Sequence, residues 1–282
     1  MRILTYKSDS DLFDVRQVIK KNFNISSALL TMLKNSGGIK VNGKVVTVRH
    51  ILSYDDVLTL EIPAEKSDIV PVKGEIEILY EDEDVLCVNK PCCMPTHPSQ
   101  NHHADTLANV VMYYFSGTDN SFHAVNRLDS YTSGVVVIAK NAYSASILSG
   151  NLQSHLFDKH YVAICNGIFS KKQGRIIEPI GRAEGSTIKR CVSNDGKYAE
   201  THYKVIAESD GKSLVELQPI TGRTHQIRVH MAHIGHSLHN DFLYDSQSDG
   251  VTPFSLHCKS LTLIHPHTNK KLIINAEISW IF

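Results

Sequence analysis

A polar stretch over residues 63–74 divides this chain in two, and the break limits the folds that the chain can adopt. The stretch contains Pro63 and Pro71, shows no hydrophobic periodicity and separates regions whose apolar patterns differ. Such a composition is typical of a linker. The length of 282 residues suffices for one large or two ordinary domains. We therefore expect a small module over residues 1–62, a linker over 63–74 and a larger domain over 75–282.

The small module is predicted to begin with two helices. Apolar residues at helical spacing mark the first helix: Leu12, Val15, Val18 and Ile19. Ser10 or Asp11 could cap it. A second helix is expected to start at Ser26–Ser27 and to end at Gly37–Gly38. Three leucines of this helix are expected to face inward: Leu29, Leu30 and Leu33.

A hairpin and a strand are predicted after the helices. Asn42 and Gly43 tolerate the positive φ of a tight turn, so they predict a hairpin between residues 39–41 and 45–48. Residues 57–62 are then expected to form a strand. This order, with Ile39-Lys40-Val41-Asn42-Gly43-Lys44 at its centre, resembles the S-four-type RNA-binding domain.

The resemblance implies a cationic face that touches RNA phosphates. The basic residues available for it are Arg16, Lys20, Lys21, Lys34, Lys40, Lys44 and Arg49. For any single lysine, a solvated surface charge is the simpler explanation. The chain departs from the family pattern at Ile25-Ser26-Ser27, where an arginine is usual.

From residue 75 onward, the pattern changes to many strands with few helices between them. Residues 135–140 form a nearly all-apolar run, which suits a strand covered on both faces. Helical spacing recurs over 142–154 and 224–235. Further strands are expected over 75–80, 85–89, 161–165, 199–207, 213–217, 254–263 and 272–278. These elements predict an α+β fold with a large mixed or antiparallel sheet, flanking helices and a central cleft.

Charge and cysteine content exclude several classes of protein. The 29 basic residues equal the 29 acidic ones in number. This excludes a surface that is strongly basic overall, but it does not exclude one basic face. No apolar run approaches the roughly 20 residues that span a bilayer, and the first residues lack a signal core. The six cysteines form no CxxC pair, although Cys92 and Cys93 are adjacent. We therefore expect reduced thiols in a cytoplasmic protein.

Three polar segments interrupt the apolar strands of the larger domain. The first, residues 126–134, places Asp129 at the mouth of the apolar run, where a charge is costly to desolvate unless it is paired. For an isolated aspartate, a structural turn or a cap is the simpler explanation. The second segment centres on Tyr161, which by itself is typical of a core tyrosine. The third, residues 221–230, carries too many hydrogen-bonding side chains for an ordinary exposed helix start.

Together the three segments resemble the RluA-type pseudouridine synthases. Asn126–Gly134 looks like their Arg-Leu-Asp-x-x-Thr-Ser-Gly segment, Lys159–Gly167 like Lys-x-Tyr-x-Ala, and Gly222–His230 like Gly-Arg-Thr-His-Gln-Ile-Arg-Val-His. Two further landmarks match: Lys90-Pro91 with His97-Pro98, and Leu256-His257 with His265-Pro266. The resemblance covers the chain from about residue 75 to its end.

The chain departs from this family at three places. Asn126 stands where many relatives have histidine, and Cys92-Cys93 replaces the glycine that is usual after Lys-Pro. The Gly-Asp…Tyr-Gly pattern is present as Asn240-Asp241…Tyr244-Asp245. Each departure could alter substrate choice, but none removes a residue expected to do chemistry.

The resemblance implies that Asp129, Tyr161 and Arg223 are catalytic. Asp129 would attack the uracil ring or the anomeric carbon, or promote elimination to a glycal, in a site that needs no cofactor and no metal. Arg223 would pair with this carboxylate bidentately and keep it ionised. Tyr161 would lie against the uracil and take part in proton removal.

Other residues are expected to hold the substrate. By resemblance Arg127 braces the position vacated by the flipped nucleotide, and Ile227 packs against the base. Lys90 and Arg228 are candidates for phosphate contact, as are Lys159 and Lys140, although each could be only a surface charge.

Three alternatives remain open at this point. His230, His233, His236 and His239 recur every third residue, which raises the possibility of a zinc-dependent hydrolase, although this period drifts around a helix. A non-catalytic RNA-binding or ribosome-assembly protein would have no need for all three catalytic residues. A glycosidase would need a second carboxylate near Asp129, and Asp241 could approach it in space.

We expect the substrate to be a structured RNA. Large-subunit ribosomal RNA is the first choice, because the front module resembles those of ribosomal-RNA synthases, and transfer RNA is the second. A monomer suffices for all of these expectations.

Overall fold

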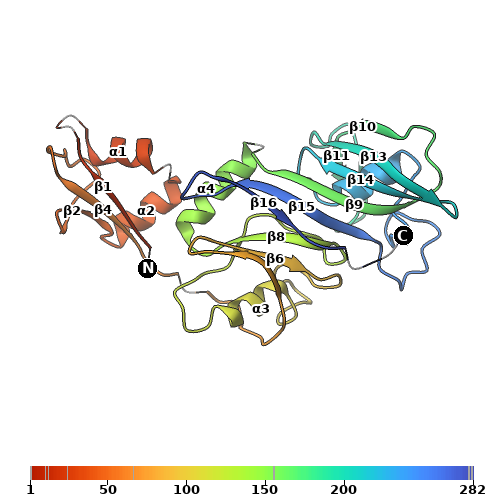
Figure 1. Ribbon diagram of the computed structural model, residues 1–282, viewed down its shortest axis with the longest axis horizontal. Coiled ribbons are helices and arrows are strands. Elements are labelled where there is room, and N and C mark those ends of the chain that lie inside the picture. The colour runs from red at the N-terminus through yellow and green to blue at the C-terminus, as the bar shows by residue number, and fades with distance from the viewer. Residues whose placement is uncertain are drawn as a thin grey trace.

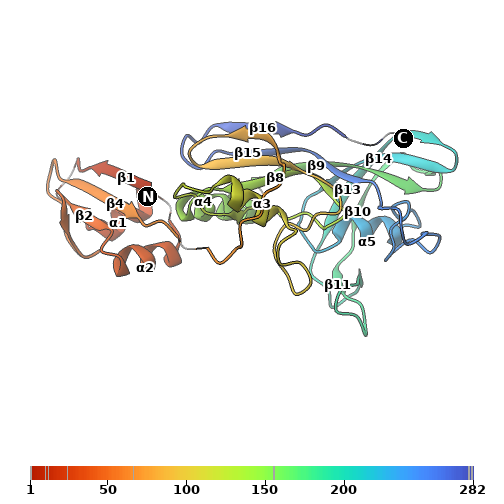
Figure 2. The ribbon, with the colours of Figure 1, turned by 90° about the horizontal axis from the view of Figure 1, so that it is seen from below.

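A computed structural model describes all residues except Met1, Ser10, Leu12, Asn24, Lys66, His155, Ser279 and Ile281. Figures 1 and 2 show a small module at one end, drawn in red and orange, and a long sheet that extends away from it. This large, mostly antiparallel sheet with few helices confirms the predicted α+β class. Within the described residues, no helix is both long enough and apolar enough to cross a membrane.

The N-terminal module, residues 2–62, packs two helices against a four-stranded sheet. The helices are α1 (Val15–Asn22) and α2 (Ser27–Asn35). The sheet order is β1 (Arg2–Lys7), β4 (Val57–Ile62), β2 (Ile39–Val41) and β3 (Lys44–Val45). Asn42 and Gly43 have φ of 49° and 79°, as the hairpin prediction requires. Strand β1 was not predicted, and β3 is shorter than expected.

The helix caps of the module show how local chemistry sets the boundaries. Ser26 caps α2 by accepting the N–H of Leu29, as predicted. The predicted cap of α1 is wrong: Asp14 caps it, in a reciprocal capping box with Gln17. Asp11 instead accepts the N–H of Tyr54. Ser10 and Leu12, which were also part of this prediction, lie outside the described residues.

The main sheet contains ten strands, and all but one of its pairings are antiparallel. Along its path run β10 (Gln173–Ile177), β13 (Glu200–Ser209), β14 (Lys212–Pro219), β9 (Asp158–Asn166), β15 (Leu256–Ile264), β8 (Ser133–Ala139), β6 (Val85–Lys90) and β5 (Glu77–Glu81). Strand β16 (Lys271–Asn275) pairs with β15, and β7 (His123–Ala124) pairs with β8. The pairing of β15 with β8 is the parallel one.

The predicted apolar run is the central strand β8, and each of its residues is buried. Gly134 at its start has φ of 111°, and a Cβ there would lie 2.3 Å from the carbonyl oxygen of Cys258. Glycine is therefore required where β8 meets β15.

Three helices lie along one face of the main sheet (Figure 2). They are α3 (Leu107–Tyr114), α4 (Ala142–Gln153) and α5 (Gln226–His233). The sequence predicted α4 and α5 but missed α3. It also missed the short strands β7 and β10 and the hairpin of β11 (Ile180–Arg182) and β12 (Arg190–Val192), which packs beside α5.

The N-terminal module is docked against α4. Tyr143 and Ile147 of α4 belong to the apolar core of the module. Arg2 reaches across to Glu83 and Asp84, at 2.8 and 3.0 Å. A cavity of about 420 Å³ lies at this junction, with Arg2 among its lining residues and Asp129 not among them.

Candidate active site

Asp129 lies in a tight turn that is fixed to the central strand. The turn closes through the bond from the N–H of Thr132 to the carbonyl of Asp129, at 3.0 Å. Buried Asn126 anchors it by bonding the carbonyl of Val135 and the N–H of Val137, at 3.0 and 2.8 Å. Asn126 departs from the family pattern, but its side chain still holds the turn in place. About a third of the Asp129 side chain stays exposed.

Arg228 joins Asp129 to a second, buried carboxylate. Its Nε and Nη2 donate to Asp241 at 2.7 and 2.8 Å, and its Nη1 donates to Oδ2 of Asp129 at 3.2 Å. Arg228 is 3% exposed and Asp241 is fully buried. Burial opposes the charge of Arg228, but Asp241 and then Asp129 more than offset this and raise its pKa. Two carboxylates therefore share one guanidinium.

Aromatic rings surround the Arg228 guanidinium. Its Cζ lies 5.5 Å from the ring centroid of Phe242, 5.1 Å from that of Tyr244 and 4.6 Å from that of Phe254. These rings shield the guanidinium from water and interact favourably with its charge. Asn240, which stands in for the family glycine, has φ of 67°, a conformation that asparagine tolerates. The segment that carries Phe242 and Tyr244 therefore keeps the turn at Asn240.

His225 presents a second polar group to Asp129. It precedes α5 in the left-handed conformation, with φ of 56°, and such strain is typical of functional sites. Its Nδ1 lies 2.9 Å from the Tyr244 hydroxyl, which also accepts the N–H of Arg190. In the tautomer that carries its ring hydrogen on Nε2, Nδ1 accepts the hydroxyl hydrogen of Tyr244. Nε2 lies 3.8 Å from Oδ2 of Asp129.

His225 is neutral in this arrangement. Burial lowers its pKa, and although Asp129 opposes this shift, the charges of Arg228 and Arg190 reinforce it. The neutral imidazole can therefore accept the Tyr244 hydrogen and present Nε2–H to Asp129 together.

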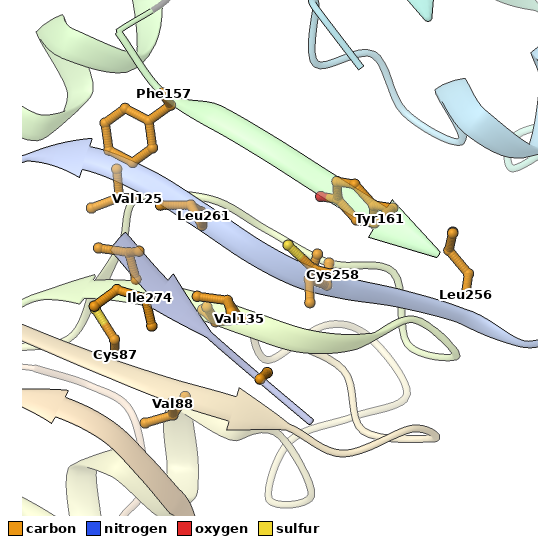
Figure 3. Packing of buried hydrophobic residues seen from close by; sticks show 14 of the residues in the cluster. Cys87, Val88, Val125, Val135, Phe157, Tyr161, Leu256, Cys258, Leu261 and Ile274 are labelled. Atoms are coloured by element: carbon orange, nitrogen blue, oxygen red, sulfur yellow. The ribbon is translucent and has the colours of Figure 1, made fainter. Parts of the chain in front are cut away.

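Tyr161 lies on β9, directly opposite Cys258 of β15 (Figure 3). Burial raises its pKa well above 10, and the Cys258 thiol and the Asp129 charge add to this shift. The phenol is therefore protonated at neutral pH. It is suited to packing against a base and to donating a hydrogen bond, whereas the predicted role in proton removal would require a group that first takes its proton.

The predicted pairing of Arg223 with Asp129 is wrong. The Arg223 side chain is exposed, and its Nε donates to the carbonyl of Tyr198 at 2.9 Å. The reason lies in the loop before α5: buried Gln226 accepts the N–H of Arg223 and donates to the carbonyl of Glu200. This holds the start of the loop against β13, while Arg228, in the first turn of α5, faces Asp129.

The expected phosphate contact of Lys90 is also contradicted. Lys90 is fully buried, and its Nζ donates to the carbonyls of Pro91, Met94 and Ser130, at 2.8, 2.7 and 3.1 Å. Burial lowers its pKa to about 8. Lys90 therefore ties the segment after β6 to the turn of Asp129. Lys140 is likewise engaged, with Glu81 at 2.8 Å.

The remaining candidates fall into two groups. Ile227 is buried in the same apolar cluster as Tyr161, whereas Arg127 is exposed beside the Asp129 turn. In the N-terminal module, Lys40 is half-buried and bonded to Glu61 at 2.7 Å. The other basic side chains named for RNA contact are exposed: Arg16, Lys20, Lys21, Lys34, Lys44 and Arg49.

The regularly spaced histidines do not converge. His230 is buried and bonded to Thr201 and to the carbonyl of Glu178, at 2.9 and 3.0 Å. His236 and His239 both bond Asn166, one at its carbonyl and the other at its side chain. Within the described residues, no group of three or more His, Cys, Asp or Glu side chains could hold a metal ion.

Asp241 was considered as the second carboxylate that a glycosidase would need near Asp129. It does approach Asp129, but both of its oxygens are taken by Arg228 and one also accepts the N–H of Leu243. It therefore stabilises charge and is not free to donate a proton as a glycosidase acid does.

Sequence reasoning missed the roles of Asp241, Tyr244 and His225. The signal was the Asn-Asp…Tyr-Asp pattern at residues 240–245, which the sequence shows as a departure from the family pattern, with Asp241 considered only as a possible second carboxylate of a glycosidase. A polar pattern directly after a helix that carries Arg228 could have suggested the pairing.

Comparison with known proteins gives one consistent result. Residues 84–233, more than half of the chain, match the family model described as RNA pseudouridylate synthase. The chain is 38% identical over 259 residues to an uncharacterized RNA pseudouridine synthase, YjbO, of Bacillus subtilis, covering 90% of this chain and 92% of the relative. It is 33% identical over 264 residues to the ribosomal large subunit pseudouridine synthase D of Zymomonas mobilis, covering 87% and 82%.

A solved structure agrees with these matches. Human RNA pseudouridylate synthase domain containing 1 superposes with a TM-score of 0.62 and 25% sequence identity, covering 76% of this chain and 86% of the human chain.

Proposed function

The chain belongs to the RluA-type RNA pseudouridine synthases, which isomerise uridine in RNA to pseudouridine, and we propose that Asp129 performs this reaction on a flipped-out nucleotide. The reaction breaks a carbon–nitrogen glycosidic bond and forms a carbon–carbon bond between the same sugar and base. It neither consumes water nor transfers electrons overall. A single well-placed carboxylate can therefore serve as the reacting group.

The proposal rests mainly on the different bonding of the two carboxylate oxygens of Asp129. Its Oδ2 is held by Nη1 of Arg228, while Nε and Nη2 of the same guanidinium donate to Asp241. Among the described residues, Oδ1 has no hydrogen-bond partner. One oxygen is thus held in place while the other is left for the substrate, in a fixed field that needs no rearrangement during the reaction.

Further residues are proposed to hold the everted uridine. Tyr161 and Ile227 supply the apolar surface against the base, because both belong to the core cluster that borders the turn. Exposed Arg127 and Arg223 are proposed to contact the RNA backbone. Flipping the nucleotide costs a few kcal/mol, which such contacts would offset.

We propose large-subunit ribosomal RNA as the substrate of a cytoplasmic monomer. The name of the Zymomonas mobilis relative supports the ribosomal target. We further propose that residues 1–62 form an S-four-type RNA-binding domain, joined by residues 63–74 to a catalytic domain over 75–282. The exposed basic side chains of α1 and α2 support this role.

The test compares total RNA from cells that contain wild-type protein, Asp129→Asn or no protein. Pseudouridine mapping should show one or more sites in large-subunit ribosomal RNA that depend on the wild type. In tritium-release assays, Asp129→Asn should lose roughly 10³-fold or more in rate. Asp195→Asn, on an exposed loop, is the matched control and should retain activity. Normal turnover by a folded Asp129→Asn protein would refute the assignment.

A further inference from the structure

Cys92 and Cys93 form a pair of exposed, adjacent thiols. Their sulfurs lie 3.4 Å apart, and both are free. Three of the other cysteines, Cys87, Cys165 and Cys258, are buried. The pair is thus accessible to small molecules, and its two sulfurs are in contact.

The backbone of Cys93 is strained in a way that glycine would avoid. Its φ is 62°, in the left-handed region, where a side chain is unfavourable. The family pattern described above has a glycine in this segment, where this chain has the Cys92-Cys93 pair. A strained non-glycine residue is a reason to look for a function of its side chain.

Hydrogen bonds of Cys92 and of Lys90 connect this pair to the turn of Asp129. The Cys92 thiol donates to the carbonyl of Tyr131, at 3.2 Å. Lys90 bonds the carbonyls of Pro91 and Met94 on one side and that of Ser130 on the other. Ser130 and Tyr131 directly follow Asp129. A change in the bonding of the two thiols would therefore alter the contacts that hold the turn of Asp129.

We propose that Cys92 and Cys93 are a modification site, at which a low-molecular-weight disulfide such as oxidised glutathione converts them to a vicinal disulfide and thereby lowers synthase activity. The effect on activity rests on the proposed role of Asp129, but the modification itself does not.

The chemistry balances as two thiol–disulfide exchanges. One cysteine thiolate attacks the oxidant, forms a mixed disulfide and releases one glutathione thiol. The other cysteine attacks the mixed disulfide, closes the ring and releases the second glutathione. The protein loses two protons and two electrons, and the oxidant gains them.

Closing the ring changes the contacts of the turn. The sulfurs must move from 3.4 Å to about 2.05 Å, and Cys92 loses its S–H. The bond to the carbonyl of Tyr131 is therefore lost. Burial, with help from Cys93, raises the pKa of Cys92 to about 11. Cys92 thus keeps its S–H near neutral pH, and oxidation is faster in mildly alkaline buffer.

The experiment exposes the full-length protein to oxidised glutathione, with and without later dithiothreitol. Intact mass after alkylation of the remaining thiols reports the modification, and tritium release from labelled RNA reports the activity. Wild type should lose two hydrogens and two alkylatable thiols without keeping glutathione. Its rate should fall at least severalfold and recover with dithiothreitol.

Two variants provide matched controls. Cys93→Gly suits the left-handed conformation and cannot close the ring, so oxidised glutathione should cause no loss of two hydrogens in it. Cys92→Ser keeps a donor for the carbonyl of Tyr131 and should retain glutathione on Cys93 as a stable adduct.

Each contrary outcome overturns a part of the proposal. Unmodified thiols or persistent glutathione adducts in wild type would rule out the vicinal disulfide. A disulfide that leaves the rate unchanged would rule out the coupling to the turn. Failure of the proposed catalytic role is distinguishable, because Asp129→Asn would then be as active as reduced wild type while the mass change persisted.

Discussion

The basic residues of this protein differ between two regions, the cluster around Arg228 and the N-terminal module. Arg228 is almost fully buried, bonded to two carboxylates and surrounded by three aromatic rings. The module's candidate RNA contacts, apart from Lys40, are exposed. A buried charge depends on its fixed neighbours, whereas an exposed charge is screened by salt. Changes in the first region should therefore affect stability and turnover, and changes in the second should affect RNA affinity.

The largest expected effect is that of Arg228→Met. Removing the guanidinium leaves Asp241 buried without its partner, which should lower the free energy of unfolding by about 3–5 kcal/mol. Urea unfolding measures this loss. A decrease below about 1 kcal/mol would show that the cluster does not depend on this ion pair.

A double variant sharpens this test. Asp241→Asn combined with Arg228→Met removes the uncompensated charge and should recover part of the lost stability. Activity should stay low, because Asp129 still lacks its donor. Full activity in the double variant would contradict the positioning role of Arg228.

The next effect concerns His225 and pH. The unfolded chain binds a proton at His225 below about pH 6.5, whereas the folded chain binds it only at lower pH, because burial lowers the pKa of His225. The contribution of neutral His225 to stability is therefore present above pH 6.5 and is lost as the pH falls through the folded-state pKa. Urea unfolding at several pH values measures this.

His225→Gln is the matched control, because its amide can replace Nε2–H as a donor but does not titrate. This variant should not show the loss of stability at acid pH that titration of His225 causes, and it should keep most of the wild-type turnover. Identical pH profiles for wild type and His225→Gln would remove His225 from the site.

Tyr244→Phe should lower kcat by roughly tenfold, since a hydrogen bond near a charge contributes about 1.5 kcal/mol or more.

A smaller effect is expected from the module. Lys20→Ala together with Lys34→Ala should weaken RNA binding about tenfold and reduce the slope of log affinity against log salt by about 1–2. The matched control is Lys40→Ala, because Lys40 is already bonded to Glu61. If Lys40→Ala weakened RNA binding as much as the double variant, exposed lysines would contribute no more to RNA affinity than a lysine bonded within the module. That result would contradict the prediction.

The smallest effect is expected from Arg223→Ala. The side chain is exposed and bonded to one carbonyl, so stability should change by less than about 0.5 kcal/mol. If the residue contacts RNA as proposed, KM should rise a few-fold while kcat is kept. Steady-state kinetics separate the two constants, and a large loss in kcat would restore the role that the sequence suggested.

The sequence predicted best where neighbouring residues decide the structure. The apolar run of β8, the cap at Ser26 and the turn at Asn42–Gly43 depend on contacts within a few residues, and all three are confirmed. The cap of α1 was missed because Asp11 and Asp14 are both plausible caps. Only Asp14 has a glutamine three residues later to complete the capping box.

The candidate site shows where such reasoning stops. The sequence identified the three segments that carry Asp129, Tyr161 and the two arginines, because each places polar groups beside apolar strands. It selected the wrong arginine, since Arg223 and Arg228 lie five positions apart on one segment. For Lys90 it predicted a phosphate contact or a plain surface charge, because a lysine that bonds three carbonyls has no signature of its own.

The sequence by itself therefore determined the fold class, the family and the segments of the site, because periodicity and motifs are local properties of a chain. Only the tertiary structure decided that Arg228 meets Asp129 across 99 positions and holds Asp241 behind it. The physical reason is that pairing between buried charges depends on the packing of α5 against the main sheet, which no stretch of the sequence encodes alone.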